Sequence, residues 1–190
     1  MVVLCPAHES HVTHLNVIFN HYVENTVMTF ATTPISDDEA YIKYRSVKDS
    51  GLPYIVALDS DDSSDPVGYI YATPYRGDRG GYVHSVEISM FCHPQRVGKG
   101  AGTALLTRFL EVLREPERFD DEWLGGRRRG PERRVCEIIA IMALDEDGRD
   151  RGLGLKKFYE RFGFEEVGRL RRVGRKFGRW VDTLYLQLSI

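Results

Sequence analysis

The chain has 190 residues, with 26 lysines and arginines against 28 aspartates and glutamates, for a formal net charge of −2. This length suits a single domain, residues 1–190, that can bury roughly 70% of its unfolded surface without disulfides or a metal. The near balance of charge argues against a general nucleic-acid or membrane-surface protein.

The first ten residues and the three cysteines predict a cytoplasmic location. The start MVVLCPAHES lacks the charged region and apolar core of a signal peptide, and no apolar run is long enough to span a membrane. Cys5, Cys92 and Cys136 are isolated from one another and from histidine clusters. We therefore expect no metal site, no disulfide framework and a reducing compartment.

Apolar spacing predicts one strand and two helices at the start of the chain. Residues 2–5 form a short strand, and Ser10 is expected to cap the first helix. Ser36 is followed three residues later by Glu39, a capping box that opens a second helix running to about residue 48. The apolar face of the first helix comprises Val12, Leu15, Ile18, Phe19 and Tyr22.

The middle of the chain is typical of three strands followed by a glycine-rich loop and a helix. Residues 54–58 and 67–75 are predicted strands, and the segment DSDDSSDP between them reads as their hairpin loop. The third strand covers residues 83–92, and the helix after the glycines runs to about residue 114.

The last third of the chain predicts three more strands and one helix. Residues 135–144 form an apolar run typical of a strand covered on both faces. Residues 155–162 form a helix, and strands 166–173 and 181–188 close the chain, joined by a glycine-rich basic loop. The order of elements predicts an α/β (mixed α+β) fold, with a central mixed sheet of about seven strands flanked by about four helices.

An unusually long connection, residues 116–134, separates the helix after the glycines from the next strand. It is either a mobile lid or a surface insertion. Phe119, Trp123 and Leu124 are apolar enough to pack on the body or on a second subunit, and disorder is the alternative. Its arginines are most simply solvated, which makes nucleic-acid binding the weaker interpretation.

Three alternating glycines, Gly98, Gly100 and Gly102, suggest an anion site. Their backbone N–H groups can approach an anion closely, and the helix behind them points its positive dipole end there. A P-loop would need a Gly-Lys-Ser/Thr ending, but Lys99 lies between two glycines. A dinucleotide fingerprint would need an acidic residue at the end of a second strand, and Glu117 lies in a charged stretch without strand character. A pyrophosphate site remains, alongside a turn that binds nothing.

The loop resembles the acetyl-coenzyme A loop of GNAT acetyltransferases, Gln/Arg-x-x-Gly-x-Gly/Ala. A literal match begins at Gln95, but the phase of the helix places the last two motif glycines at Gly100 and Gly102. Val97 then occupies the Gln/Arg position, which removes one side-chain hydrogen bond and leaves the backbone cradle intact. By resemblance the cofactor is acetyl-CoA, held by Val97, Gly98, Lys99, Gly100, Ala101, Gly102 and Thr103.

Four longer stretches resemble the phosphinothricin acetyltransferase branch of that family. The first is NHYV at 20–23 with Asn25, Thr26, Thr29, Phe30, Thr32 and Pro34, and the second is SVEIS at 85–89 with His93 and Pro94. The third is FYERFGF at 158–164, and the fourth is VGRKFGRWVD at 173–182. Four matches in the right order over most of the chain are stronger support than any one loop. The resemblance implies the GNAT fold, acetyl transfer to an amine, and a homodimer.

The chain also departs from that branch. Gly152 and Leu155 stand where the family usually has an asparagine and a serine, so a polar contact to the cofactor is lost or replaced. Arg175 replaces a phenylalanine that is often found beside the substrate. The insertion at 116–134 is unusual in the branch. These departures leave the substrate open.

Acetyl transfer needs a neutral amine, a polarised thioester carbonyl and a proton for the departing thiolate. Glu87 is the candidate general base, because a carboxylate between Val86 and Ile88 projects to the opposite sheet face and is costly there unless used or paired. Pairing with an arginine is the structural alternative. Tyr159 matches in position a residue that the family often uses as the acid, with core packing as its alternative.

Cofactor and acceptor contacts follow from the same resemblance. Where the strands separate after Glu87, the main chain of Met90, Phe91 and Cys92 is expected to bind the pantetheine arm and polarise the acetyl carbonyl. Cationic residues near the acceptor would suit a carboxylate. The predicted substrate-binding residues are Phe30, Arg79, Tyr82 and Arg175.

These observations predict a cytoplasmic, acetyl-CoA-dependent N-acetyltransferase. It would acetylate a small amino-acid-like amine, such as phosphinothricin or methionine sulfoximine, by direct transfer. One alternative keeps the cofactor and changes the acceptor to a polyamine or a protein amine. Another is a non-catalytic acyl-CoA-binding module. Neither nucleic acid nor membrane is an expected partner.

Overall fold

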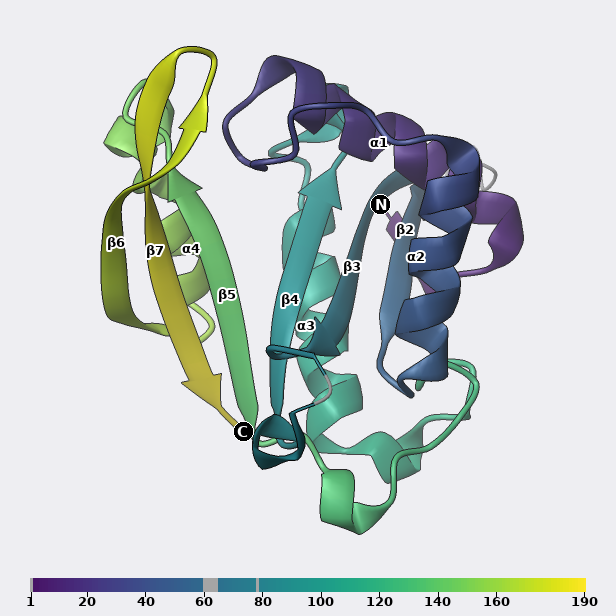
Figure 1. Cartoon of the computed structure of the whole chain (residues 1–190). Coiled ribbons are helices and arrows are strands. Elements are labelled where there is room, and N and C mark those ends of the chain that lie inside the picture. The colour runs from purple at the N-terminus through teal and green to yellow at the C-terminus, as the bar shows by residue number, and fades with distance from the viewer. Residues whose placement is uncertain (1, 60–64, 78) are drawn as a thin grey trace.

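The computed structural model describes residues 2–59, 65–77 and 79–190, so most of the hairpin loop expected at 59–66 lies outside the described residues. One seven-stranded sheet has the order β1-β2-β3-β4-β5-β7-β6. Helices α1 and α2 pack on one face, and α3 and α4 on the other (Figure 1). The β4–β5 pair is parallel and the other pairs are antiparallel, which confirms the predicted mixed sheet.

The predicted elements are present in the predicted order. The strands are β1 (Val2–Pro6), β2 (Tyr54–Asp59), β3 (Pro66–Pro74), β4 (Ser85–Cys92), β5 (Glu137–Leu144), β6 (Glu165–Lys176) and β7 (Arg179–Ser189). The helices are α1 (Val12–Asn25), α2 (Asp37–Asp49), α3 (Ala101–Arg114) and α4 (Gly154–Glu160).

The two N-terminal helices begin differently from each other. The capping box of α2 forms as predicted, because the Glu39 N–H donates to Ser36 Oγ at 3.2 Å and the Ser36 N–H donates to the Glu39 carboxylate at 2.7 Å. The prediction that Ser10 caps α1 is wrong. Ser10 lies inside a 3₁₀ turn, Glu9–His11, and the His8 N–H donates to His11 Nδ1 at 3.2 Å.

Helix α3 packs along β2, β3 and β4 and forms the centre of the larger core. Its Leu105, Leu106 and Phe109 are completely buried against strand residues such as Val86 and Ile138. The opposite face of the sheet is lined by tyrosines under α1 and α2, namely Tyr54, Tyr69 and Tyr71. The first strands and α3 therefore form a rigid unit that fixes the start of α3 relative to β4.

Strands β4 and β5 pair only over their first halves. Their register runs from Ser85↔Glu137 to Ile88↔Ala140 and then stops, whereas β4 stays paired with β3 as far as Cys92. The two strands diverge beyond that point, as Figure 1 shows. The last four residues of β4 therefore border an opening in the sheet, at the end where the glycine-rich loop begins.

The closing hairpin is longer than predicted. The expected basic loop is wrong, because Gly174, Arg175 and Lys176 pair with Val181, Trp180 and Arg179 as part of the ladder. The turn itself contains only Phe177 and Gly178, with φ values of +50° and +78°. Two positive φ values in a two-residue turn match the right-handed twist of the strands, so the ladder can continue up to the turn.

The 116–134 insertion packs on the body of this chain. Leu124 is 6% exposed, and Phe119 and Trp123 contact the larger core. A Cβ on Gly125 would lie 2.8 Å from the Lys48 carbonyl oxygen, so this segment sits directly against the end of α2. The insertion lies at the C-terminal end of α3, away from the glycine-rich loop. It is a surface insertion and not a lid over that loop.

Replacing Gly125 by alanine should therefore destabilise the fold more than replacing Gly126. Both residues have positive φ, which costs an L-residue roughly 1–2 kcal/mol. Only Gly125→Ala also forces a Cβ against backbone oxygens, which adds roughly 1–3 kcal/mol, because a Cβ on Gly126 would meet nothing within 4 Å. Urea unfolding of both variants measures the difference. Equal losses of stability would show that the insertion does not pack tightly.

Candidate active site

A cleft of about 590 Å³ lies where β4 and β5 separate. The glycine-rich loop and the first turn of α3 form one wall, and the β5–α4 connection with α4 forms the other. Most of the predicted cofactor residues line it: Met90, Cys92, Val97, Gly98, Gly100, Ala101, Gly102 and Thr103.

The glycine-rich loop leaves the start of α3 open to an anion. Gly98 and Gly100 have φ values of +82° and +89°, a backbone conformation that residues with a Cβ rarely adopt. Gly100 is the N-cap of α3, and among the described residues no side-chain hydrogen bond caps the first turn. The N–H groups of that turn are therefore available to a ligand, and the helix dipole favours negative charge there. Val97, at the expected Gln/Arg position, is 63% exposed. This arrangement fits the pyrophosphate of coenzyme A.

Two predicted cofactor residues direct their side chains elsewhere. The Phe91 ring packs edge-on against Phe19 and Tyr22, with ring centroids 5.5 and 5.3 Å away. Lys99 is exposed and lies outside the cleft lining. Cofactor binding through the main chain of these two residues remains a prediction.

Helix α1 is tied to the end of β4 by one hydrogen bond. The Tyr22 hydroxyl donates to the Cys92 carbonyl oxygen at 2.7 Å. Burial raises the pKa of Tyr22 to about 12 and that of the Cys92 thiol to about 11, so both groups are neutral at physiological pH. The Cys92 carbonyl, expected to serve the pantetheine arm, is thus already used by Tyr22. The main chain from 89 to 91 lies nearer the point where the strands separate.

The Glu87 side chain projects to the sheet face that the alternation of the strand predicts. Val86 and Ile88 are buried in the α3 core, and Glu87 is half-buried on the opposite face, between Thr73 of β3 and Ile139 of β5. Burial raises the pKa of its carboxyl group. Within the described part of the chain this carboxylate has no hydrogen bond or ion pair, so the arginine-paired alternative is not seen.

Tyr159 lies in the core beside the cleft. It is 5% exposed, and its ring packs against Phe164 with centroids 5.1 Å apart. Burial, with a smaller contribution from Cys92, raises the pKa of its hydroxyl far above the usual range. The hydroxyl therefore stays protonated. The neighbouring Phe158, not Tyr159, is a lining residue of the cleft, and the acid role of Tyr159 remains a prediction.

The four predicted acceptor residues fall into two pairs. Phe30 lies against the β6–β7 hairpin, where a Cβ on Gly174 would lie only 2.0 Å from its ring, and Arg175 is the next residue of β6. Arg79 and Tyr82 lie just before β4, at its opposite end. The strand register fixes this separation, because Ser85 is level with Glu137 and Ser189, whereas the hairpin turn lies beyond Leu144↔Asp182.

Arg76 is a cation that the sequence reading missed. Its guanidinium lies 5.6 Å from the centre of the Tyr75 ring, and a hydrogen bond with Tyr75 raises its pKa, with smaller contributions from Tyr82 and Tyr185. Tyr185 pairs with Ile141 of β5, so it lies on the same sheet face as Glu87. Arg76 follows β3 and Tyr185 belongs to β7, so only the folded sheet brings the two near each other.

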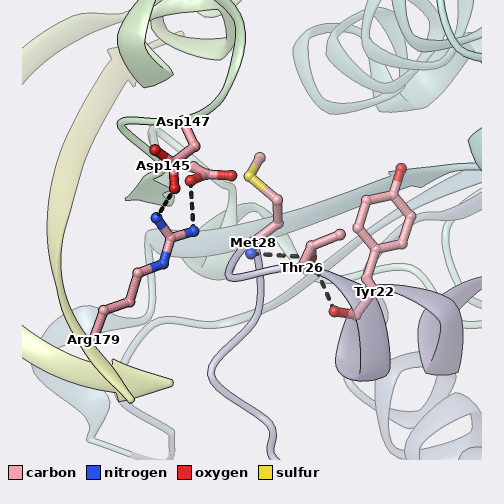
Figure 2. Close-up of polar contacts among 6 residues, drawn as sticks. All are labelled: Tyr22, Thr26, Met28, Asp145, Asp147 and Arg179. Carbon is pink, nitrogen blue, oxygen red and sulfur yellow. Dashed lines mark hydrogen bonds and ion pairs between the residues drawn. The ribbon is translucent and has the colours of Figure 1, made fainter. Parts of the chain in front are cut away.

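The β5–α4 connection is held in place by an ion pair. Arg179 Nη2 lies 2.8 Å from Asp145 Oδ1, and the same guanidinium contacts Asp147 (Figure 2). Asp145 lines the cleft, as does Met28 from the loop after α1. The Met28 N–H donates to Thr26 Oγ1 at 3.1 Å, which fixes this loop at the mouth of the cleft.

The conformation of Gly152 explains why this chain lacks the asparagine that the family usually has at this position. Its φ is +83°, and a Cβ there would lie 2.6 Å from the Asp145 carbonyl oxygen. An asparagine does not fit at this position without a shift of the main chain. Further lining residues that sequence reasoning missed are Gly148, Gly154, Phe158 and Arg161.

Comparison with known proteins agrees with this geometry. The model of the Acetyltransferase (GNAT) family matches residues 15–128. Phosphinothricin N-acetyltransferase of Alcaligenes faecalis is 32% identical over 173 residues, which cover 91% of this chain and 75% of that protein. L-methionine sulfoximine/L-methionine sulfone acetyltransferase of Pseudomonas aeruginosa is 30% identical over 178 residues, covering 91% and 86%.

Among solved structures, a phosphinothricin acetyltransferase of Sinorhizobium meliloti in complex with acetyl-CoA superposes with a TM-score of 0.78 and 27% identity. The match covers all of this chain and 88% of that one. The chain belongs to the GNAT acetyltransferase family and has its fold. It is an N-acetyltransferase, and its cofactor is acetyl-CoA. Over the described residues, no helix has the length and apolar character that a membrane span requires.

Arg179→Gln should weaken acetyl-CoA binding about 3- to 10-fold, because it releases the β5–α4 wall of the cleft. Arg169→Gln is the matched control, since Arg169 is similarly exposed and pairs with Asp182 on the same hairpin without touching the cleft. Exposed pairs contribute at most about 1 kcal/mol to stability, so both variants should fold. Calorimetric titration with acetyl-CoA measures the affinities. The same affinity in both variants would rule out a role for the Asp145 contact in cofactor binding.

Proposed function

We propose that the protein transfers the acetyl group to the amino group of a small amino-acid-like compound of the phosphinothricin or methionine sulfoximine type, with Glu87 as general base. The observation that carries this proposal is the half-buried Glu87 carboxylate, which lacks an ion-pair partner among the described residues. It stands one residue before the point where β4 and β5 separate. The activities named for the two relatives support the substrate class.

The proton movements follow from where these groups lie. Glu87 accepts a proton from the ammonium group of the acceptor, directly or through a water molecule, which frees the nitrogen lone pair. Bound acetyl-CoA supplies the acetyl group, so one N–C bond forms and one C–S bond breaks. Main-chain N–H groups of 89–91 stabilise the oxyanion. Tyr159, whose hydroxyl is protonated before the reaction, gives the thiolate its proton. The acetylated nitrogen then loses its second proton, which restores the Tyr159 hydroxyl, and Glu87 passes the first proton to solvent. No covalent bond to the enzyme forms.

The acceptor reaches Glu87 from the sheet face opposite α3. Ile139, Ile141 and Tyr185 of β5 and β7 are only half-buried on this face, so it remains accessible beside Glu87. Arg76 lies near Tyr82 and Tyr185 and can bind a carboxylate through its planar guanidinium. An arginine on this face favours an amino acid over a polyamine, which is itself cationic.

Cytoplasmic location and a homodimer complete the proposal. The isolated, free cysteines support the first, and the sequence resemblance supports the second. A homodimer would also bear on the acceptor site, because one chain holds Arg79 and Tyr82 at the opposite end of β4 from Phe30 and Arg175. Gel filtration with light scattering measures the oligomeric state.

Glu87→Gln should lower kcat with phosphinothricin or methionine sulfoximine about 10²-fold or more, while acetyl-CoA affinity is unchanged. Burial raises the pKa of Glu87, so wild-type kcat/KM should rise with pH through an ionisation above the ordinary glutamate value of about 4.3. Thiol release from acetyl-CoA measures the rate. Wild-type turnover in the variant would remove Glu87 from the mechanism, and no turnover of any amino acid by the wild type would contradict the proposed substrate class.

The same substitution should raise stability at neutral pH. A raised folded-state pKa means that the folded protein binds this proton more tightly than the unfolded chain, so stability is greatest at low pH and falls as pH rises through the folded-state pKa. Glutamine does not ionise. The Tm of Glu87→Gln should therefore exceed that of the wild type at pH 7 and approach it near pH 4. A lower Tm at pH 7 would indicate a stabilising contact of the charged carboxylate.

Arg76→Gln should raise KM about 10-fold for an amino-acid acceptor and leave KM unchanged for the corresponding amine without a carboxylate. The comparison isolates the ion pair, because both acceptors present the same amino group. Arg118→Gln, a change of the same type at an exposed position in the insertion, is the control. Equal effects of Arg76→Gln on both acceptors would place the carboxylate elsewhere.

A further inference from the structure

A second cavity, of about 230 Å³, lies under the 116–134 insertion at the C-terminal end of α3. Its walls are mainly apolar. They include Leu52 after α2, Val112 and Leu113 of α3, and Leu124 of the insertion. The cavity shares no lining residue with the cofactor cleft, which lies at the other end of α3.

One side of this cavity is strongly cationic. Arg128, Arg129, Arg133 and Arg134 line it, and Glu117 is the acidic lining residue. Two of the arginines already have acceptors. Arg128 pairs with Asp121 and donates to the Pro116 carbonyl, and Arg134 donates to the Arg114 carbonyl at 2.6 Å.

Arg129 is the group with unused hydrogen-bonding capacity. Its Nη2 donates to the Val83 carbonyl oxygen at 2.9 Å. Its Nε and Nη1 atoms are buried, and neither has a hydrogen-bond partner in the described part of the chain. Burial lowers the pKa of Arg129, and the charge of Arg133 lowers it further. A buried cationic donor without an acceptor is destabilising, and a neighbouring like charge adds to the cost.

An anion in this cavity would offset the positive charges of Arg129 and Arg133, which both line it. A shift of the Arg129 side chain toward the cavity would also let the anion's oxygens accept from Nε and Nη1, both of which are buried. The size of the cavity and the chemistry of its walls limit which anions fit. A volume of 230 Å³ is below the roughly 300–1,000 Å³ of pockets for drug-sized ligands, so a nucleotide does not fit. Apolar walls of leucine and valine favour an organic anion over an inorganic one.

We propose that this cavity binds a small monocarboxylate with a short apolar tail, its carboxylate against Arg129 and Arg133 and its tail against Leu52, Val112 and Leu124. The ligand would also be linked to the active-site strand, because Arg129 donates a hydrogen bond to the carbonyl of Val83, two residues before β4. The His84 ring is likewise hydrogen-bonded to the Arg134 carbonyl, with Nδ1 at 2.7 Å. The insertion would thus give this enzyme a ligand site separate from the site of acetyl transfer.

Sodium hexanoate is the probe, titrated calorimetrically and in thermal unfolding without acetyl-CoA or acceptor. Hexan-1-ol supplies the tail without the charge, acetate the charge without the tail, and sulfate an inorganic anion. Hexanoate at ten times its Kd should raise the Tm by roughly 3–6 °C. Each of the other three should shift it by less than 1 °C at the same concentration.

Variants locate the site. Arg129→Gln should weaken hexanoate binding at least 10-fold, whereas Arg127→Gln, in the same insertion but outside the lining of this cavity, should not. Arg76→Gln should also retain binding, which separates this site from the proposed acceptor site. If Arg129→Gln fails to fold, Arg133→Gln takes its place with the same expectation.

The proposal is overturned by a wild type that does not bind hexanoate, by unchanged binding in the Arg129 or Arg133 variant, or by sulfate or hexanol acting as strongly as hexanoate. Because binding is measured without turnover, these outcomes do not depend on which amine the enzyme acetylates.

Discussion

The function depends on the place where β4 stops pairing with β5. After Ile88↔Ala140 the last four residues of β4 face an opening and not a neighbouring strand, while β3 still holds β4 on its other edge. Main-chain groups inside a sheet are normally used by the next strand, so a ligand can bind β4 only where that strand turns away. The glycine-rich loop, the uncapped start of α3 and the β5–α4 wall all meet at this opening.

The burial of the Glu87 carboxylate and its raised pKa result from its place in the sheet, just before β4 and β5 separate. Its neighbours Val86 and Ile88 are buried under α3, and the alternation of the strand places its carboxylate on the other face, half-buried among β-strand side chains. Burial without an ion pair in the described structure raises its pKa, which suits a group that must accept a proton near neutral pH.

Features of the fold that depend on residues a few positions apart could be predicted from the sequence. Alternation around Glu87, the capping box at Ser36 and the glycines before α3 were predicted because each is set by residues a few positions apart. Arg76 near Tyr185, and Arg179 on Asp145, were missed because they join segments that meet only when the sheet is assembled. The β6–β7 loop was mispredicted for the same reason, because its cross-strand pairs override its glycine-rich composition.

Backbone hydrogen exchange, measured by NMR with and without acetyl-CoA, tests most directly whether the unpaired end of β4 holds the cofactor. We expect slower exchange for amides at 89–92 that do not pair with β3, and for the first-turn amides of α3 at 101–103. Amides at 85–88 lie where β5 still covers the edge of β4, so they should change little. Protection spread evenly along β4, or absent from 89–92, would contradict the account.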